Sequence, residues 1–515
     1  MKTLLLLLFL ATPAAADVLR LTLSADEAAA DRAAGTMPAR VTISNLSNSA
    51  VEQVRLTLDS NLEVLFDDPA WSCTGSPNFR ECTYSGSIDA HAELVLPLTL
   101  RFPRGIGRGR INAYVTYGPQ RSFGDSRVIS VAMWRPFLVT SSSDAGAGTL
   151  RAAIEALNAD PECRVLPCRI EFALPAPAAG GWSTIMPATP LPTIIGGDVS
   201  VDATTQADTN PLGPDVELIG TSVVQGNGLY LRGAQMSVRG LAIGGFPDNG
   251  ILYFPTARGS LFTIERNYIG VDATGTRAIA NGSRGIVIAE GIVTSSAIRE
   301  NVISGNFRSG IFIVTQTEPA FPLSPVLTIA GNRIGVAAAS DAPIPNGASG
   351  IFVGPNAEQV AIAGNVIAHN AHFGVAVSRT ARYVQVQQNR IFGHPGSGID
   401  INLDGPSVEP ATAIESARYE AATDTTTIVL RGPRSFGFPR YSYAFYANTT
   451  VDAAGFAEGE QFLGTAVPDA NGTAVLSVKG DLRGKYVDAV ITFMTDADGS
   501  PLFATSEFLR AVRVE

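Results

Sequence analysis

Ile362-Ala-Gly-Asn365-Val-Ile367, followed by Gly374-Val-Ala-Val377, is the stretch of sequence that decides the fold. Its first part, an asparagine with apolar residues three positions before it and two after it, recurs at residues 264–269, 298–303, 329–334, 362–367 and 386–391. Its second part, a glycine that opens a short apolar strand, recurs at Gly228, Gly250, Gly285, Gly310, Gly350, Gly374 and Gly398. The asparagine precedes the glycine by 9 residues in three copies and by 18 in two, and the last three glycines are 24 residues apart. Short strands in a unit of this length, with insertions at one fixed point, are typical of a β-solenoid.

The repeat predicts a parallel β-helix whose rungs stack about 4.8 Å apart. Each rung should bury its apolar residues on those of the next, so that Ile303, Ile334, Ile367 and Ile391 form one interior column. The recurring asparagines can stack as an amide ladder at a turn, since asparagine tolerates the left-handed backbone conformation. A glycine before the second strand suits a bend that leaves no room for a Cβ atom. Because this structural explanation is complete, the repeats alone indicate no chemistry.

The whole chain is expected to be an all-β protein in which two sandwiches flank the repeats. The expected segments are an immunoglobulin-like β-sandwich over residues 17–134, the β-helix over residues 135–418 and a second β-sandwich over residues 419–515. One amphipathic helix is predicted at residues 149–158, with Thr149 as its N-cap. It directly precedes the repeats, where a solenoid needs its open end covered.

The N-terminus has the three parts of a secretory signal peptide. Lys2 is followed by an apolar run at residues 4–10 and by three alanines at residues 14–16. We therefore expect residues 1–16 to be removed and the protein to be exported, to the periplasm, the cell surface or the medium. No later stretch is long and apolar enough to predict a membrane span.

Charge and cysteine content restrict the partners and ligands of this chain. Charged residues make up 16% of the sequence and the formal net charge is −10, which argues against nucleic acids and anionic membranes. The four cysteines form two near pairs, Cys73 with Cys82 and Cys163 with Cys168, and an exported chain favours two local disulfides. Neither pair has the spacing of a zinc site, so no metal and no cofactor is expected.

Several segments of the chain resemble, residue by residue, segments of one large group of known proteins. Asn267-Tyr-Ile-Gly-Val-Asp-Ala-Thr-Gly-Thr276 and residues 391–400 resemble rungs of exported bacterial right-handed parallel β-helix repeat proteins of the pectate-lyase-like superfamily. Residues 139–159 resemble their opening segment, although the cysteine that many of them carry there is missing. Residues 443–464 resemble the sandwich that often follows. The resemblance covers residues 137–515. It implies the architecture but no single function, because the superfamily includes pectate lyases, polygalacturonases and adhesins.

Enzymes that cleave polysaccharides on this scaffold gather carboxylates on one outer face, so we followed the outward columns of the repeats. One column places Glu265 next to Arg299, and its neighbour contains Glu300. These three residues are a candidate acid/base site, with a surface ion-pair ladder as the alternative interpretation. Asp400, Asp404 and His394 form a second polar cluster. Because His394 takes the position that Asn306 and Asn370 hold in earlier rungs, we expect it to be a turn residue facing solvent.

A third column is largely apolar. The second residue after each repeat glycine should point outward, which gives Tyr230, Leu252, Val287, Phe312, Phe352, Ala376 and Asp400. Aromatic rings on an outer face suit sugar rings, and Tyr230, Phe312 and Phe352 are therefore candidate ligand-binding residues. The alternative is that an insertion loop or a flanking sandwich packs over the column. The insertions at residues 270–284, 315–325 and 335–349 lie close enough to do so.

The sequence thus leads to an expected function and to alternatives. The leading hypothesis is a secreted or surface-displayed β-helix protein that binds an extracellular polysaccharide or a cell-surface protein without turnover. The alternative is a polysaccharide lyase or glycoside hydrolase, and a third hypothesis is a structural spacer of the cell envelope. An acidic cluster on an outer face would favour an enzyme, and the sequence does not predict one.

Overall fold

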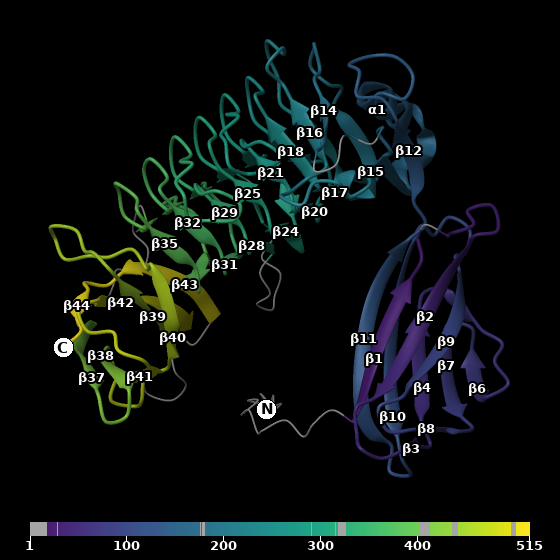
Figure 1. Ribbon diagram of the computed structural model, residues 1–515, viewed down its shortest axis with the longest axis horizontal. Helices are drawn as coiled ribbons and strands as arrows, with labels where there is room; N and C mark the ends of the chain where they lie inside the picture. Colours follow the sequence, from purple (N-terminus) through teal and green to yellow (C-terminus); the bar gives the residue numbers. More distant parts are fainter. Residues whose placement is uncertain are drawn as a thin grey trace. The chain divides into compact units, whose positions relative to one another are not determined.

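A computed structural model describes residues 18–27, 29–175, 177, 181–289, 291–314, 316–317, 326–401, 412–434, 441–495 and 501–515 (Figure 1). Residues 1–16, the expected signal peptide, lie outside this description. The chain separates into two compact units, Met1–Arg135 with Val165–Pro167, and Pro136–Arg164 with Cys168–Glu515. The regular secondary structure of both is almost entirely strand.

The first unit contains two antiparallel sheets around one core. One sheet has the strand order β1 (Leu19–Ala25), β2 (Thr36–Asn45), β9 (Glu93–Arg101), β5 (Glu63–Leu65). The other has the order β11 (Ser122–Ala132), β10 (Arg108–Tyr117), β4 (Arg55–Ser60), β7 (Phe79–Tyr84), β6 (Trp71–Ser76), and β3 (Val51–Glu52) pairs with β8 (Ser87–Ile88). Alternate residues of both sheets are buried together, such as Leu21 of β1 and Ile111 of β10. Cys73 and Cys82 lie directly opposite each other on β6 and β7 and form a disulfide, which confirms their predicted pairing.

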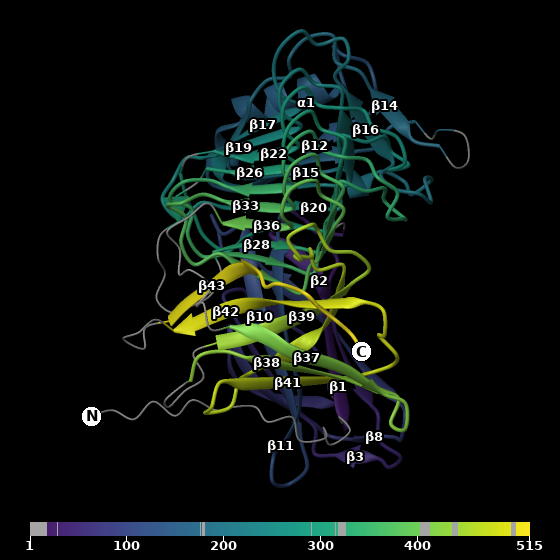
Figure 2. The ribbon, with the colours of Figure 1, turned by 90° about the vertical axis from the view of Figure 1, so that its left-hand side faces the viewer.

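The second unit is a parallel β-helix with three faces. The long strands β15 (Ile194–Asp202) and β17 (Leu229–Arg239) each contribute to two faces, because β17 pairs with β19 through its first half and with β20 through its second half. The first face continues as β19 (Ile251–Pro255), β22 (Ile286–Ile288), β26 (Ile311–Ile313), β30 (Ile351–Val353), β33 (Val375–Val377) and β36 (Ile399–Ile401). Figure 2 shows this stacking, with all of these strands except β30 labelled. The second face continues as β20 (Leu261–Glu265), β24 (Ser296–Arg299), β28 (Leu327–Ala330), β31 (Val360–Ala363) and β34 (Gln385–Gln387).

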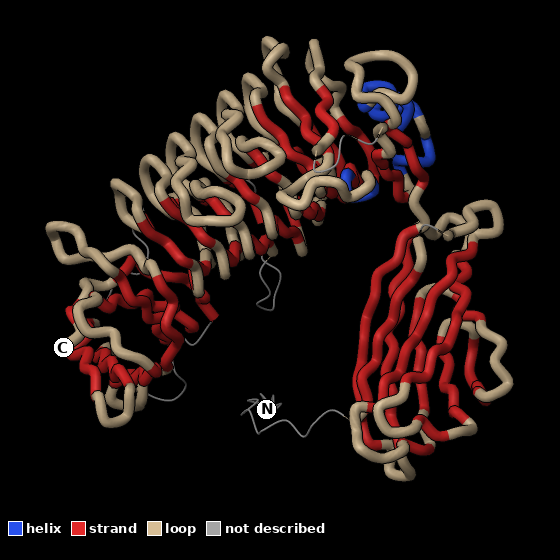
Figure 3. Tube along the Cα trace, viewed as in Figure 1, coloured by secondary structure: helices blue, strands red, loops and turns tan. Residues whose placement is uncertain are grey.

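The third face is a separate parallel sheet, and its last five strands directly follow the repeat asparagines. Its strands are β14 (Ser183–Ile185), β16 (Val216–Ile219), β18 (Leu241–Gly244), β21 (Tyr268–Ile269), β25 (Val302–Ile303), β29 (Arg333–Ile334), β32 (Val366–Ala368) and β35 (Arg390–Phe392). A short parallel pair, β23 (Ile292–Val293) with β27 (Gln316–Thr317), lies outside the three faces. Loops between the third face and the next first-face strand follow one another along one edge, drawn tan in Figure 3.

The interior of the β-helix consists of stacked apolar columns. Ile303, Ile334, Ile367 and Ile391 are paired rung to rung and are at most 1% exposed, which confirms the predicted column. A rung alone could not bury these side chains, since each is covered only by its neighbours above and below. The free energy of burial is therefore shared between rungs.

Amide side chains connect the rungs beside this column. Asn267, Asn301, Asn332, Asn365 and Asn389 form the predicted ladder, in which each Nδ2 donates to the Oδ1 of the next asparagine at 2.9–3.1 Å. The same Oδ1 atoms also accept the backbone N–H of the preceding ladder asparagine, as Asn365 does from Asn332 at 2.9 Å. All five side chains are buried, so their hydrogen bonds meet no competition from water.

Backbone geometry explains two features of the repeat. The residue before each ladder asparagine has a left-handed backbone, with φ between 55° and 66° at Arg266, Glu300, Gly331, Gly364 and Gln388. Gly240, which precedes Leu241 at the same position of an earlier rung, has φ 75°. Glycine is frequent there because it adopts this conformation without steric cost. Gly350, before its first-face strand, lies where a Cβ atom would approach the Ile367 side chain to 2.7 Å. The bend that the sequence predicted therefore requires glycine.

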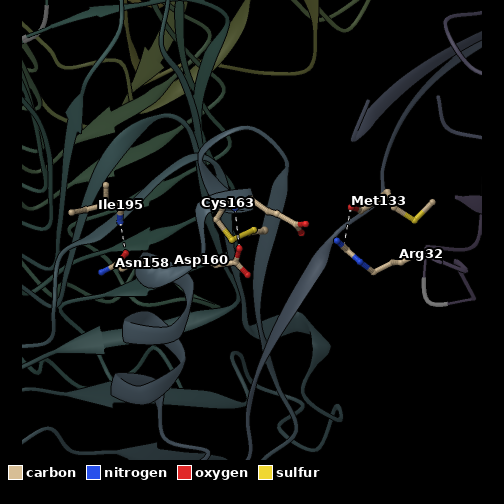
Figure 4. Close-up of a disulfide and its surroundings, with 8 residues drawn as sticks. Arg32, Met133, Asn158, Asp160, Cys163 and Ile195 are labelled. Atoms are coloured by element: carbon tan, nitrogen blue, oxygen red, sulfur yellow. Dashed lines mark hydrogen bonds between the residues drawn. A yellow bond between two sulfur atoms is a disulfide. The ribbon is translucent and has the colours of Figure 1, made fainter. Parts of the chain in front are cut away.

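The N-terminal end of the β-helix carries the only helix longer than one turn among the described residues, α1 (Leu150–Ala159). Thr149 is its N-cap and accepts a hydrogen bond from the N–H of Ala152. Its buried residues belong to the core of the β-helix. The adjacent disulfide, Cys163–Cys168, also forms as predicted, and Figure 4 shows Cys163 beside Asp160, whose carbonyl oxygen accepts its N–H. In the part of the chain that is described, no helix has the length and apolar character to cross a membrane.

Two further sheets follow the last rung. One has the order β37 (Ala413–Glu420), β38 (Thr425–Arg431), β41 (Thr473–Lys479), and the other contains β40 (Gln461–Ala466), β39 (Tyr441–Asn448), β42 (Tyr486–Thr495), β43 (Pro501–Phe508) and β44 (Val512–Arg513). The second sheet is buried on both faces. Tyr443 and Phe445 belong to a core shared with the first sheet, whereas Tyr446 and Phe508 belong to the core of the β-helix. The C-terminal strands thus cover the open end of the solenoid.

Replacing Ile367 with alanine should lower the free energy of unfolding by about 2–5 kcal/mol, because the cavity cannot be filled from neighbouring rungs. Ile367→Val, which removes one methyl group, should cost about 0.5–1.5 kcal/mol. Chemical denaturation of both variants measures the difference. Equal stabilities of Ile367→Ala and the wild type would contradict the packing of this column.

Asp488 of β42 predicts a pH dependence of stability. Burial raises the pKa of this carboxyl to about 8, and neither of its oxygens has a hydrogen-bond partner among the described residues. The side-chain amide of Asn448 partly offsets this rise in the pKa of Asp488, although the two side chains do not reach hydrogen-bonding geometry. Since the folded state binds the proton more tightly than the unfolded chain, stability should fall by up to about 1.4 kcal/mol per pH unit as the pH rises from near 4 to near 8.

Asp488→Asn should remove this pH dependence, because an amide does not ionise. Thermal unfolding between pH 4 and pH 9 would measure it, with the wild type losing stability relative to the variant as the pH rises. Parallel curves for the two proteins would show that Asp488 is charged in the folded state.

Candidate functional site

The outer column of the first face is the strongest candidate site. Strand pairing aligns Tyr230, Leu252, Val287, Phe312, Phe352, Ala376 and Asp400 in consecutive rungs, as the alternation of the strands predicts. Phe312 and Phe352 are half-buried, and so is Tyr230. Residues 315 and 318–325, one of the insertions expected to cover the column, lie outside the described residues.

The rings of the column form a stack along the axis of the β-helix. Phe312 and Phe352 have ring centroids 5.0 Å apart and planes inclined by 9°. On the other side, the guanidinium carbon of Arg284, which comes from the preceding rung, lies 3.8 Å from the centroid of Phe312. Both faces of the Phe312 ring are therefore occupied, and we call Arg284, Phe312 and Phe352 the aromatic stack.

Phe352 is the end of this stack. The next residue in the column is Ala376, whose methyl group is too small to cover a phenyl face, and the one after it is Asp400. Two rung spacings, about 10 Å, therefore separate Phe352 from Asp400. Ala376 itself is buried, with 6% of its surface exposed, and we call the stretch of the column from Phe352 to Asp400 the Ala376 slot. Partial burial raises the pKa of the Asp400 carboxyl. An aromatic face opposite a carboxylate suits a sugar ring, whose C–H groups pack on the ring and whose hydroxyls donate to the oxygens.

The carboxylates of the second face are engaged in ion pairs. Glu265 accepts a hydrogen bond from Arg299 Nε at 2.7 Å, and Glu300 accepts one from Arg266 Nε at 2.7 Å. The hydrogen bond and charge of Arg266 lower the pKa of Glu300. A carboxyl group that is held ionised by an arginine is a poor general acid. The geometry at Glu265, Arg299 and Glu300 favours the ion-pair ladder over the candidate acid/base site.

His394 does not face solvent as the sequence predicted. Its side chain is fully buried, and its Nε2 lies 3.3 Å from Nδ2 of Asn370. Asn370 is the last asparagine of a second ladder, formed by Asn281, Asn306, Asn346 and Asn370 with Nδ2–Oδ1 distances of 2.9 Å. The prediction was wrong because the turn position in this rung points inward, and the imidazole replaces the missing amide.

Glu458, from the segment before β40, holds the other side of this imidazole. Its Oε2 lies 3.0 Å from His394 Nδ1 and also accepts the backbone N–H of His394 at 3.1 Å. A neutral ring with its hydrogen on Nδ1 satisfies both contacts, because Nδ1 then donates to Glu458 and Nε2 accepts from Asn370. Glu458 is 64 residues away in sequence, so no local pattern could have identified it.

A cleft of about 570 Å³ lies beside His394 between the last rung and the C-terminal strands. Four carboxylates line it, those of Asp452, Glu458, Glu460 and Glu507. Each accepts a backbone N–H, from Phe456, His394, Thr449 and Ile401 respectively, and so fixes a loop. Asp400 does not line the cleft, and Asp404 lies outside the described residues. Among the residues described, no group of three or more His, Cys, Asp or Glu side chains could hold a metal ion.

Comparisons with known proteins leave the family open. No protein-family model matches the chain, and no curated protein matches it. A GH20 exo-β-N-acetylglucosaminidase from Vibrio harveyi is 14% identical over 22% of this chain, with a TM-score of 0.14, and this chain spans only 18% of its length. The enzymatically active domain of tailspike protein 2 of bacteriophage CBA120 is 9% identical over 68% of this chain and 69% of its own, with a TM-score of 0.22. The Agl-KA catalytic domain is 13% identical over 74% and 77%, with a TM-score of 0.24. Likeness at these TM-scores carries no argument about this chain.

His394→Ala should lower the free energy of unfolding by about 1–3 kcal/mol, because it leaves the Asn370 amide and the Glu458 carboxylate without their buried partner. His394→Asn should restore most of this loss, since asparagine occupies the same position in earlier rungs. Denaturant unfolding of the two variants measures the difference. If His394→Asn is as unstable as His394→Ala, the imidazole does not substitute for an amide in the ladder.

Proposed function

We propose that this protein is exported and binds an extracellular glycan without turning it over. The glycan would lie on the first face of the β-helix, at the aromatic stack and the neighbouring Ala376 slot. The observation that carries the proposal is the stack of Phe312 on Phe352, which leaves one face of Phe352 directed at a column position with no large side chain. An outer sheet face does not need such rings for stability, because the interior columns already hold the rungs together.

The distribution of carboxylates favours binding over turnover. Glycosidases place two carboxyl groups about 5–10 Å apart on either side of the scissile bond. The first-face column has one carboxylate, Asp400, and the described acids of the second face and of the cleft beside His394 are engaged by arginines, backbone N–H groups or the imidazole. The alternative, a lyase or glycoside hydrolase, has one point in its favour: the raised pKa of Asp400 would suit a general acid. Release of reducing sugar or of unsaturated products would establish that alternative.

Export and the finer details of the architecture belong to the same proposal. The sequence of residues 1–16 and the two disulfides support an oxidising compartment outside the cytoplasm. A right-handed coil and a place in the pectate-lyase-like superfamily are supported by the resemblance of the rungs and by the general preference for right-handed parallel crossovers. An immunoglobulin-like type for the two flanking sandwiches is supported by their antiparallel sheets. A cell-surface protein is the other partner that this face would suit.

Phe352→Ala should weaken glycan binding at least tenfold, which corresponds to about 1.4 kcal/mol for a lost stacking platform. Its melting temperature should change little, since the ring is half-buried. The wild-type protein is first screened on a glycan array, and the variant is then titrated with the best ligand. Phe123→Ala, which removes a 65% exposed ring in the first unit, is the matched control.

The competing interpretation is that loops pack on the column. In that case Phe312→Ala and Phe352→Ala would each lower stability by several kcal/mol, as buried aromatic truncations do, and would leave any glycan binding unchanged. That result would exclude the aromatic stack as a binding platform.

A further inference from the structure

Two arginines, one in the aromatic stack and one in the next rung, have no acidic partner among the described residues. Arg284 and Arg308 lie in consecutive rungs, in the segments that precede the first-face strands β22 and β26. Neither forms an ion pair with a described carboxylate, whereas Arg239, Arg266 and Arg299 of the second face each pair with one. The arginines of the second face form ion pairs between rungs, whereas Arg284 and Arg308 form none with a described residue. This contrast indicates that Arg284 and Arg308 do not serve to hold rungs together.

The two guanidinium groups also disfavour each other. The pKa of Arg284 is lowered, first by its partial burial and second by the charge of Arg308. Two like charges in a partly desolvated position cost free energy that a bound anion would offset. The nearby Asp248 carboxylate is used elsewhere, since its Oδ2 accepts the backbone N–H of Gly226.

The space beside these arginines can accept a ligand. A shallow cleft of about 690 Å³ is lined by Arg284, Arg308 and Phe307, together with residues such as Ala280 and Pro345 from neighbouring loops. Phe307 is 68% exposed, so its ring is accessible to a molecule bound in the cleft. Arg284 joins this cleft to the aromatic stack, because its guanidinium lies over Phe312.

We infer that the cleft of Arg284, Arg308 and Phe307 is an anion-binding subsite of the glycan face, and that the ligand is an acidic glycan whose carboxylate or sulfate groups are bound there. This inference rests on the proposed function and names the class of glycan. Guanidinium groups bind carboxylate and sulfate oxygens through paired N–H donors, and Phe307 would contact the sugar that carries the acid. The net charge of −10 repels polyanions at long range, so recognition depends on these short-range contacts.

The test uses the full mature protein and an array of glycans in matched pairs: dextran with dextran sulfate and carboxymethyl dextran, and neutral galactans with galacturonans. We expect retention of the acidic member of at least one pair. Binding should fall at least tenfold in Arg308→Gln and less in Arg308→Lys, which keeps the charge but not the fork of donors. Arg104→Gln, which removes one exposed arginine from the first unit, should bind as the wild type does.

The possible outcomes distinguish failure of the anionic subsite from failure of the proposed function. Preference for neutral glycans, with Arg308→Gln unaffected, would overturn the anionic subsite and leave glycan binding intact. Absence of binding to every glycan would overturn both. Because removal of Arg308 relieves repulsion on Arg284, the melting temperature of Arg308→Gln should not fall. A lower melting temperature would show that Arg308 has a structural role instead.

Discussion

The stacking of one rung on the next is the constraint on which the rest of this protein depends. A rung of two dozen residues cannot bury its isoleucines by itself, so every rung needs a neighbour in register. The amide ladders enforce that register, because each asparagine Nδ2 reaches the Oδ1 of the next rung only when the strands are aligned. Interior packing and buried amides therefore stabilise the same alignment.

This dependence makes both ends of the β-helix critical. At the first end, α1 places its apolar side against the interior. At the far end, groups from the C-terminal strands replace the missing rung: the Tyr446 hydroxyl accepts the N–H of Gln388, and Glu458 holds the imidazole that ends the second ladder. Asp488 lies on the sheet that covers this end, and its burial there disfavours the charged carboxylate and raises its pKa.

The outer faces are free of this constraint, and they differ from one another. Alternating charges occupy three consecutive rungs of the second face, at Arg239, Glu265 and Arg299, and Glu265 and Arg299 neutralise each other. The first face has rings instead, with Asp400 at the last rung of the column and two arginines without a described acidic partner near Phe312. Arg284 belongs to both features, since it lies over Phe312 and lines the neighbouring cleft. An apolar platform next to uncompensated positive charge is the surface that an acidic sugar would complement.

The sequence by itself determined the repeat, the Ile303 to Ile391 column, the asparagine ladder, the disulfide pairs and the outward position of Phe312 and Phe352. The disulfide pairs follow from the short spacing of the cysteines. The other features follow from local periodicity, and a strand can alternate in only one way once its interior side is known. The orientation of His394, its contact with Glu458, the position of Arg284 over Phe312 and the burial of Asp488 were decided by the tertiary structure. Each depends on where a loop or a distant strand lies, and spacing along the chain has no information about groups that meet only when the ends of the solenoid are covered.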